Sequence, residues 1–363
     1  MENPLKHFAE LTDPRVERTK EHLLQEILFI AIAAVLCGAE TWNDIEFYGK
    51  TKRGWLKRFL HLPSGIPSHD TFNRVFSALD PEELEACFVA WVRDVAHLSE
   101  GEVVSIDGKA IRGSRQAGKK AIVHMVSAWA NSNNLVLAQR KVADKSNEIT
   151  AIPKLLQVLE LSGTVVTIDA MGCQRSIAQQ IADKKADYIL AVKENQGNLL
   201  AEMKDSFHML PVAAVAEETD GGHGRVERRI CSVLGDLSLV EKAAEWASLQ
   251  SLVRIQAERI HKATGRVERE TRYYISSIQP DAQRLNRAVR QHWGIENSLH
   301  WVLDVAFHED QSRKRTGHAP QNFSLINRIA LNLLKHDKTK LGIRGKRLVA
   351  GWDNNFVLRL LRN

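Results

Sequence analysis

The chain has 363 residues, of which 44% are hydrophobic and 26% are charged, and its formal net charge is +6. This composition excludes a mainly disordered chain and a collagen-like repeat, and the four scattered cysteines exclude a disulfide framework and suit a reducing cytoplasm. The longest apolar run, Ile27–Cys37, is too short to cross a bilayer, so no membrane partner is expected.

The positive charge is concentrated at the carboxyl end. Residues 311–363 contain 12 Lys and Arg against 2 Asp and Glu, whereas residues 1–98 contain 11 against 15. Clustered basic side chains are typical of a surface that meets a polyanion, although a solvated face is the alternative. We therefore expect Arg313, Lys314 and Arg315 to contact DNA phosphates, and residues 341–363 to form a basic tail.

Residues 1–98 are predicted to form an all-helical domain. Apolar residues recur at helical spacing over residues 23–36, 42–60, 72–79 and 84–95. The turn Leu62–Pro67 separates the second helix from the third, and Ser68 or Asp70 then stands where an N-cap belongs. Two short helices joined by a turn resemble a helix-turn-helix, which predicts that this domain binds DNA.

From Glu102 onward, strands alternate with helices. Strands are predicted at 103–107, 122–130, 135–142, 165–169 and 187–192, with helices at 148–161 and 174–185. This order is typical of an α/β domain with a ribonuclease-H-like core, which we place at residues 99–340. Strands near 225–234, 251–260 and 267–278 predict a mostly β insertion at about 195–285, and helices at 288–305 and 321–334 follow.

Two nearly identical strand endings carry the clearest chemical signal. Asp107 ends the segment Val-Val-Ser-Ile-Asp, and Asp169 ends Val-Val-Thr-Ile-Asp. Ligands of open α/β sheets bind beyond the carboxyl ends of the strands, so neighbouring strands would bring these carboxylates together. Two close carboxylates need a cation between them, and hard oxygen ligands favour Mg²⁺ or Mn²⁺.

A third acid would complete a two-ion site of the kind that cleaves phosphodiesters. Glu296 is the expected residue, because it lies at the edge of a helical face formed by Ile295, Leu299 and Val302. The alternatives are Asp304, Glu309 and Asp310.

Three segments resemble the catalytic blocks of DDE transposases, and the H-repeat-associated transposases of bacterial insertion sequences are the most similar family. These segments are Asp107–Gly113, Asp169–Gln174 and Arg290–Trp301; the resemblance extends to Ile66–Phe76, Leu190–Gln196 and His223–Arg225. It implies a bacterial enzyme that cleaves and transfers DNA strands with two Mg²⁺ or Mn²⁺ ions on a ribonuclease-H-like core with a β insertion. It also implies that Asp107, Asp169 and Glu296 are the catalytic metal ligands, and that double-stranded DNA and a second copy of the chain are the partners.

The last block departs from the Tyr-x2-Arg-x3-Glu-x6-Lys pattern of many relatives, because Val289, His292, Glu296 and Leu303 occupy those four places. Other side chains must then supply the phosphate contacts. The residues that we expect to contact DNA, besides the basic triplet at 313–315, are Lys109, Arg112, Lys193, Arg225, Arg290, His292 and His300.

Two other functions remain open from the sequence. A small-molecule phosphohydrolase would need a nucleophilic Asp two residues before Asp107, where Ser105 stands. A catalytically silent, repurposed DNA-binding protein derived from a transposase is the second alternative. No Walker-type loop is present, so ATP is not implied.

Overall fold

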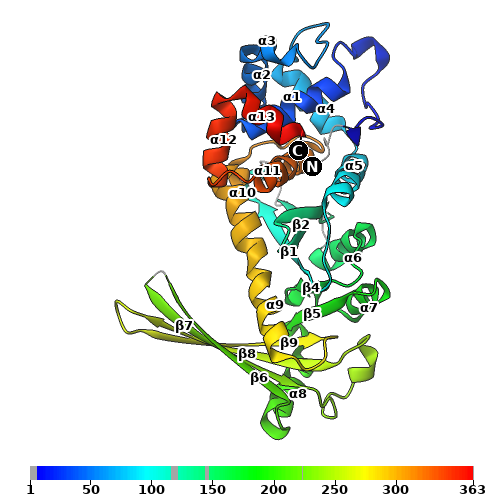
Figure 1. Cartoon of the computed structure of the whole chain (residues 1–363). Coiled ribbons are helices and arrows are strands. Elements are labelled where there is room, and N and C mark those ends of the chain that lie inside the picture. The colour runs from blue at the N-terminus through cyan, green and yellow to red at the C-terminus, as the bar shows by residue number, and fades with distance from the viewer. Residues whose placement is uncertain (1–5, 116–121, 144–146, 223, 363) are drawn as a thin grey trace.

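The computed structural model describes residues 6–115, 122–143, 147–222 and 224–362, so His223 lies outside the described residues. Its sheet is flanked by helices, and a bundle of helices from both ends of the chain lies at one end of it (Figure 1). The mixed α/β class predicted from the sequence is confirmed.

The amino-terminal helices form a bundle together with the carboxyl-terminal helices. They are α1 (Leu24–Leu36), α2 (Trp42–Thr51), α3 (Arg53–Leu56), α4 (His69–Ala78) and α5 (Pro81–Val95), and they pack with α11 (Ala319–His336), α12 (Ile343–Trp352) and α13 (Asn354–Arg362). Trp42 of α2 stacks on Phe76 of α4, with ring centroids 5.1 Å apart, and meets the edge of Phe323 of α11 at 5.2 Å. Both ends of the chain therefore share one hydrophobic core.

Local sequence explains two of these helices. Helix α1 is apolar around almost its whole circumference, and it is accordingly the buried centre of the bundle. Helix α4 begins after Ser68, whose hydroxyl accepts a hydrogen bond from the backbone N–H of Thr71, so the predicted cap is confirmed.

One nine-stranded sheet crosses the rest of the molecule. Its strands are β1 (Val103–Ile111), β2 (Val123–Ala130), β3 (Leu135–Lys141), β4 (Val165–Ile168), β5 (Asp187–Val192), β6 (Ala214–Gly222), β7 (Arg225–Leu234), β8 (Ser251–His261) and β9 (Val267–Ser276). The order is β3-β2-β1-β4-β5-β9-β8-β7-β6; β1, β4 and β5 are parallel and the other pairs are antiparallel. The strands of the predicted insertion thus extend the central sheet, and part of them projects as a long twisted arm (Figure 1).

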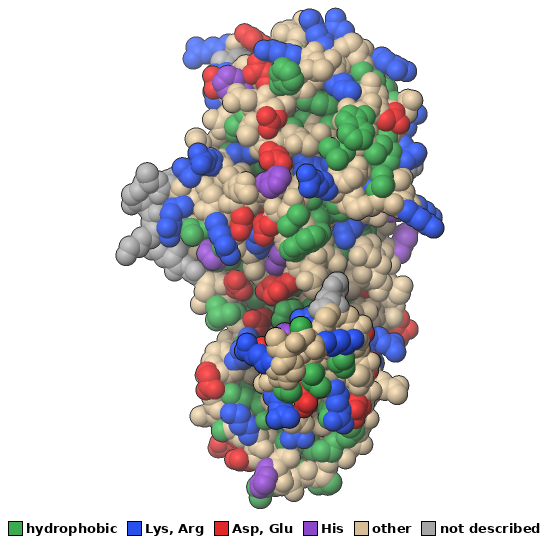
Figure 2. All heavy atoms as spheres, turned by 90° about the vertical axis from the view of Figure 1, so that its left-hand side faces the viewer, with side chains coloured by type: hydrophobic (Ala, Val, Ile, Leu, Met, Phe, Trp, Pro, Cys, Tyr) green, Lys and Arg blue, Asp and Glu red, His purple; other side chains and the backbone are tan. Residues whose placement is uncertain are grey.

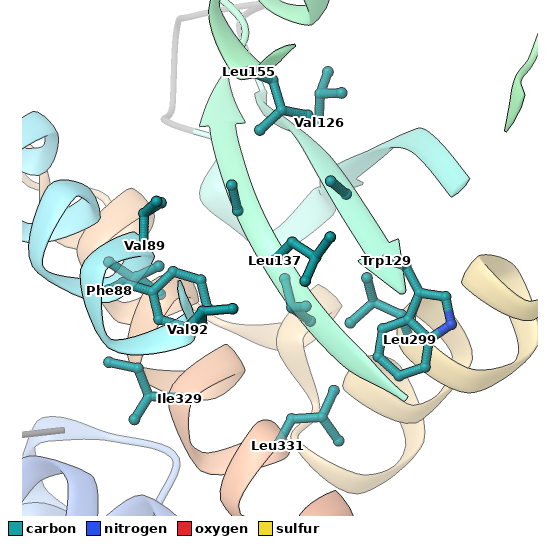
Figure 3. Packing of buried hydrophobic residues seen from close by; sticks show 14 of the residues in the cluster. Phe88, Val89, Val92, Val126, Trp129, Leu137, Leu155, Leu299, Ile329 and Leu331 are labelled. Atoms are coloured by element: carbon teal, nitrogen blue, oxygen red, sulfur yellow. The ribbon is translucent and has the colours of Figure 1, made fainter. Parts of the chain in front are cut away.

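Helices cover both faces of the sheet. Helices α6 (Glu148–Val158) and α7 (Arg175–Asp183) pack with Val104 and Ile106 of β1 on one face. Helix α9 (Ala282–Gly294) packs with Val103 of β1 on the other, as strand alternation requires. At the β3 edge, Phe88 of α5 and Ile329 of α11 close the core (Figure 3). The remaining helices are α8 (Gly197–Met209) and α10 (Trp301–Ala306).

The carboxyl-terminal residues are packed helices in the structure, which corrects the expectation of a basic tail. Lys346 of α12 is buried and donates a hydrogen bond of 2.9 Å to the carbonyl oxygen of Leu334. Arg347 is buried as well and donates to the carbonyl oxygen of Val35 in α1. These cations neutralise helix ends inside the bundle, so they are not available to a polyanion. Among the described helices, none is long and apolar enough to cross a membrane.

Candidate active site

Asp107 and Asp169 lie side by side at one edge of the sheet. Strands β1 and β4 are parallel neighbours, and their last register pair is Ile106 with Ile168. Asp107 comes directly after Ile106 on β1, and Asp169 comes directly after Ile168, the last residue of β4. The β-branched, apolar residues before each acid form buried strands, and the two strands bring both carboxylates to the same edge, as the sequence predicted.

Glu296 reaches this edge from a helix of unusual geometry. Residues Ile295–His300 form a π-helical turn between α9 and α10, with Ile295 and Leu299 buried and Glu296 exposed. A π-turn inserts one extra residue per hydrogen-bonded ring, which changes the direction of the side chains that follow, and such turns are frequent at functional sites. The helix was predicted, but the π-turn was not.

The three carboxylates line a single cavity of about 520 Å³. Its other polar lining residues are Thr167, Lys193, Glu194, Lys204, Glu270, Thr271, Arg272, Tyr273, Tyr274, His292 and Trp293. Figure 2 shows acidic side chains gathered at mid-height of the face turned to the viewer, with Lys and Arg above and below them. Acids from three separate elements thus meet in one hollow.

The two aspartates have opposite electrostatic environments. Burial is the main cause that raises the pKa of Asp107 to about 7; the charges of Glu148, Glu296 and Asp169 also raise it, whereas a hydrogen bond from the backbone N–H of Gly108 lowers it. Burial also raises the pKa of Asp169, but its hydrogen bond from the N–H of Ala170 and its ion pair with Lys193, 3.1 Å away, outweigh this and lower the pKa overall.

Two histidines beside the acids are held neutral. Burial lowers the pKa of His292 to about 4, and its Nδ1 lies 2.9 Å from the hydroxyl of Thr167 on β4. Burial lowers the pKa of His300 to about 3; its Nδ1 is 3.6 Å from Asp107, and its buried Nε2 has no hydrogen-bond partner among the described residues. Neither imidazole carries a charge that could balance Asp107 at neutral pH.

The donor chemistry of the cavity fits a hard divalent cation. Asp107 is half-buried and lies near carboxylates that raise its pKa, which is the electrostatic condition that a bound dication relieves. Within the described ranges, no three His, Cys, Asp or Glu side chains converge closely enough to enclose an ion. Asp107, Asp169 and Glu296 all line the cavity but do not enclose an ion in this conformation, so metal binding there requires their side chains to move closer together.

Comparisons with known proteins agree with this arrangement. Residues 98–333 match the family model described as "Transposase DDE domain", and residues 5–92 match the model described as "DDE_Tnp_1-associated". The chain belongs to the DDE transposase family. It is 41% identical to "Putative transposase YncI" of Escherichia coli O157:H7, over 98% of this chain and 94% of that protein.

The H-repeat-associated transposases predicted as relatives are among the matches. The chain is 38% identical to "H repeat-associated putative transposase YhhI" of Escherichia coli strain K12, over 98% of this chain and 97% of that protein. In a solved structure of the piggyBac transposase synaptic complex with hairpin DNA, one chain is similar at 13% identity and a TM-score of 0.44, covering 99% of this chain and 80% of that one.

Lys109 was expected to contact DNA, but its side chain points into the protein. Its side chain is only 7% exposed, and its ammonium lies 2.6 Å from Asp304 and 3.0 Å from Asp310. Lys109 therefore neutralises two of the alternative third acids. Arg112 also forms an ion pair with Asp310, at 3.3 Å, but its side chain is 81% exposed and remains at the surface.

The remaining alternative acid is also engaged. Glu309 is buried and lies 2.8 Å from Arg328, which is itself fully buried in α11. Asp304, Asp310 and Glu309 all have basic partners and do not line the cavity, whereas Glu296 lines it together with Asp107 and Asp169.

The basic triplet is divided by the structure. Arg313 and Arg315 are exposed, whereas Lys314 is buried, with its ammonium 3.4 Å from the centroid of the Phe323 ring. Burial lowers the pKa of Lys314 to about 7, and the ammonium donates a hydrogen bond to the carbonyl oxygen of Glu40. The expected phosphate contact of Lys314 is therefore wrong for this conformation, because a cation packed on aromatic rings is not presented to solvent.

The other residues expected to contact DNA are divided between the cavity and the surface beyond it. Lys193 and His292 line it, His300 lies beside Asp107, and Arg225 is exposed on β7. Arg290 of α9 is half-exposed and forms ion pairs with Glu218 and Asp220 of β6.

Glu148 is the residue that the sequence reasoning missed. It opens α6, and its carboxylate packs against Gly108, where a Cβ would overlap it. This contact brings a fourth carboxylate beside Asp107, and burial raises the pKa of Glu148 as well. Glu148 is far from both aspartates in the sequence, so only the glycine after Asp107 hinted at a close approach.

Proposed function

We propose that the protein is a DNA transposase that cleaves and transfers DNA strands at the ends of an insertion sequence. The single observation that carries this proposal is the convergence of Asp107, Asp169 and Glu296 on one cavity in a chain of the DDE transposase family. The arrangement of an antiparallel β3-β2-β1 unit continued by parallel β4 and β5 supports a ribonuclease-H-like core.

The three acids are the proposed ligands of two Mg²⁺ or Mn²⁺ ions. Such ions, when bound, activate the attacking hydroxyl or water and stabilise the leaving oxygen of a phosphodiester. Lys193 at the rim, paired with Asp169, is placed to contact a phosphate of the incoming strand. His292 is held neutral against Thr167, so its ring is oriented without adding charge to the site.

The proposed substrate is double-stranded DNA of the element ends and of the target, and the active assembly is a homodimer formed on DNA in the bacterial cytoplasm. The exposed residues at the start of α4, such as His69 and Asp70, lie with Arg313 and Arg315 along one hollow of about 490 Å³. This hollow supports the proposal that the amino-terminal helices contribute the sequence preference for the ends.

A transposition assay tests the proposed function. A resistance gene is placed between the DNA segments that flank the coding region, and the protein is supplied from a second plasmid. We expect insertions of the marker into a target plasmid, and none with Asp169→Asn. If the flanking DNA carries inverted repeats and the marker still never moves, the proposal is contradicted.

A further inference from the structure

A second hollow, of about 640 Å³, lies next to the catalytic cavity, and Trp293 lines both. Helix α9 and the π-turn form the ridge between them. His292 and Glu296 face the catalytic cavity, whereas Gly294 and Asn297 face the second hollow. We call this hollow the arginine groove; its lining includes Arg225, Arg229, Arg259 and Arg290, with Glu227 as its acid.

The groove is built by strand alternation. Arg225, Glu227 and Arg229 are every second residue of β7, so they project from the same face of the sheet. Arg259, opposite Glu227 on β8, joins them. The intervening residue, Arg228, projects from the other face, where it pairs with Glu217 at 2.6 Å.

Arg229 is not satisfied by the protein alone. Its side chain is 8% exposed, and one terminal nitrogen donates a hydrogen bond of 3.0 Å to Glu227. Its Nε and its other terminal nitrogen are buried and have no hydrogen-bond partner among the described residues. A guanidinium with unmade hydrogen bonds is costly to bury, and its planar fork is suited to two oxygens of a phosphate.

The opposite wall offers neutral donors. Asn134 comes from the β2–β3 turn, and Asn297 and Ser298 come from the π-turn. The amide of Asn131 in the same turn already donates to the carbonyl oxygen of Val103 and to the hydroxyl of Ser105. Gly294 allows this wall to close, because a Cβ there would overlap the amide oxygen of Asn131. Amides and hydroxyls opposite arginines are typical of contacts to the phosphates and sugars of DNA.

We propose that the arginine groove binds the phosphate backbone of the DNA strand that continues from the catalytic cavity over Trp293. The inference rests on the proposed function, since it assigns the path of the same DNA substrate. Arg259, which is 25% exposed, supplies the innermost phosphate contact, and Arg229 joins it when its buried side chain turns into the groove. Arg225 binds nearer the exposed end of the groove.

Equilibrium binding of a short fluorescein-labelled duplex, measured by anisotropy over a range of salt concentrations without divalent metal, tests the proposal. Arg229→Gln and Arg259→Gln are each expected to weaken binding about 10- to 100-fold, as for one charge-assisted contact. Each is also expected to reduce the slope of log affinity against log salt by about 0.9. Arg228→Gln is the matched control, because its side chain leaves the same strand on the opposite face, and it should bind like the wild type.

A crosslinking measurement locates the strand. Asn297→p-benzoylphenylalanine should crosslink to DNA on illumination, and Arg228→p-benzoylphenylalanine should not. Wild-type affinity and salt slope in both groove variants, or equal losses in Arg228→Gln, would overturn the groove assignment and leave the transposase proposal standing. A wild-type protein that binds no DNA at any salt concentration would instead overturn the proposed function itself.

Discussion

Replacing Asp107 by Asn should stabilise the metal-free protein at neutral and alkaline pH. The pKa of Asp107 is raised from 3.8 to about 7, first by burial and then by neighbouring carboxylates. The folded protein therefore holds this proton more tightly than the unfolded chain, and stability falls as pH rises between those two values. A rise from 3.8 to about 7 corresponds to about 4 kcal/mol of destabilisation above about pH 8, as an upper bound.

Urea unfolding followed by tryptophan fluorescence measures this effect across the pH range, with EDTA present. The advantage of Asp107→Asn over the wild type should be largest near pH 8 and should shrink toward pH 4. Asp205→Asn on the exposed side of α8 is the control, and it should follow the wild type. Added Mg²⁺ should stabilise the wild type more than the variant. A variant that is less stable than the wild type throughout this range would refute the reasoning.

Three further predictions test the site and its surroundings. Glu296→Gln should abolish DNA cleavage while Asp304→Asn retains it, because only Glu296 lines the cavity; a gel assay with labelled DNA would expose the reverse outcome. Arg328→Leu should lower the free energy of unfolding, measured in urea, by about 3–5 kcal/mol, because it leaves the buried Glu309 without its ion-pair partner. An unchanged free energy of unfolding would contradict this. The double variant Arg313→Ala, Arg315→Ala should reduce the slope of log DNA affinity against log salt by up to about two units. An unchanged slope would mean that neither arginine contacts a DNA phosphate.

The strands that carry Asp107 and Asp169 were predictable because both end a run of buried, β-branched residues. Such runs form strands in almost any α/β context, and parallel neighbours bring their ends together. The edge position of Glu296 also followed from helical periodicity. Its π-turn did not, because a π-turn differs from an α-turn by one residue and depends on packing at Ile295 and Leu299.

Charge counts were a poorer guide, since they carry no information about burial. Lys314, Lys346 and Arg347 contribute to the net charge of the carboxyl end, yet all three are buried in the structure. Lys109 is similar: it follows Asp107 closely in the sequence, but the alternation of β1 directs it to Asp304 and Asp310. The composition of the carboxyl end predicted a surface that binds a polyanion, whereas part of that positive charge stabilises helix ends inside the fold.

Metal-dependent cleavage of the flanking DNA is the measurement that tests the central claim most directly. End-labelled DNA that spans the coding region and its flanks is incubated with the protein and Mg²⁺, and the products are mapped at nucleotide resolution. The account predicts strand breaks at the element ends that require Mg²⁺ and disappear with Asp107→Asn, Asp169→Asn and Glu296→Gln, while all three variants still bind the DNA. Binding without breaks in the wild type would contradict it and would favour a catalytically silent, DNA-binding descendant of a transposase.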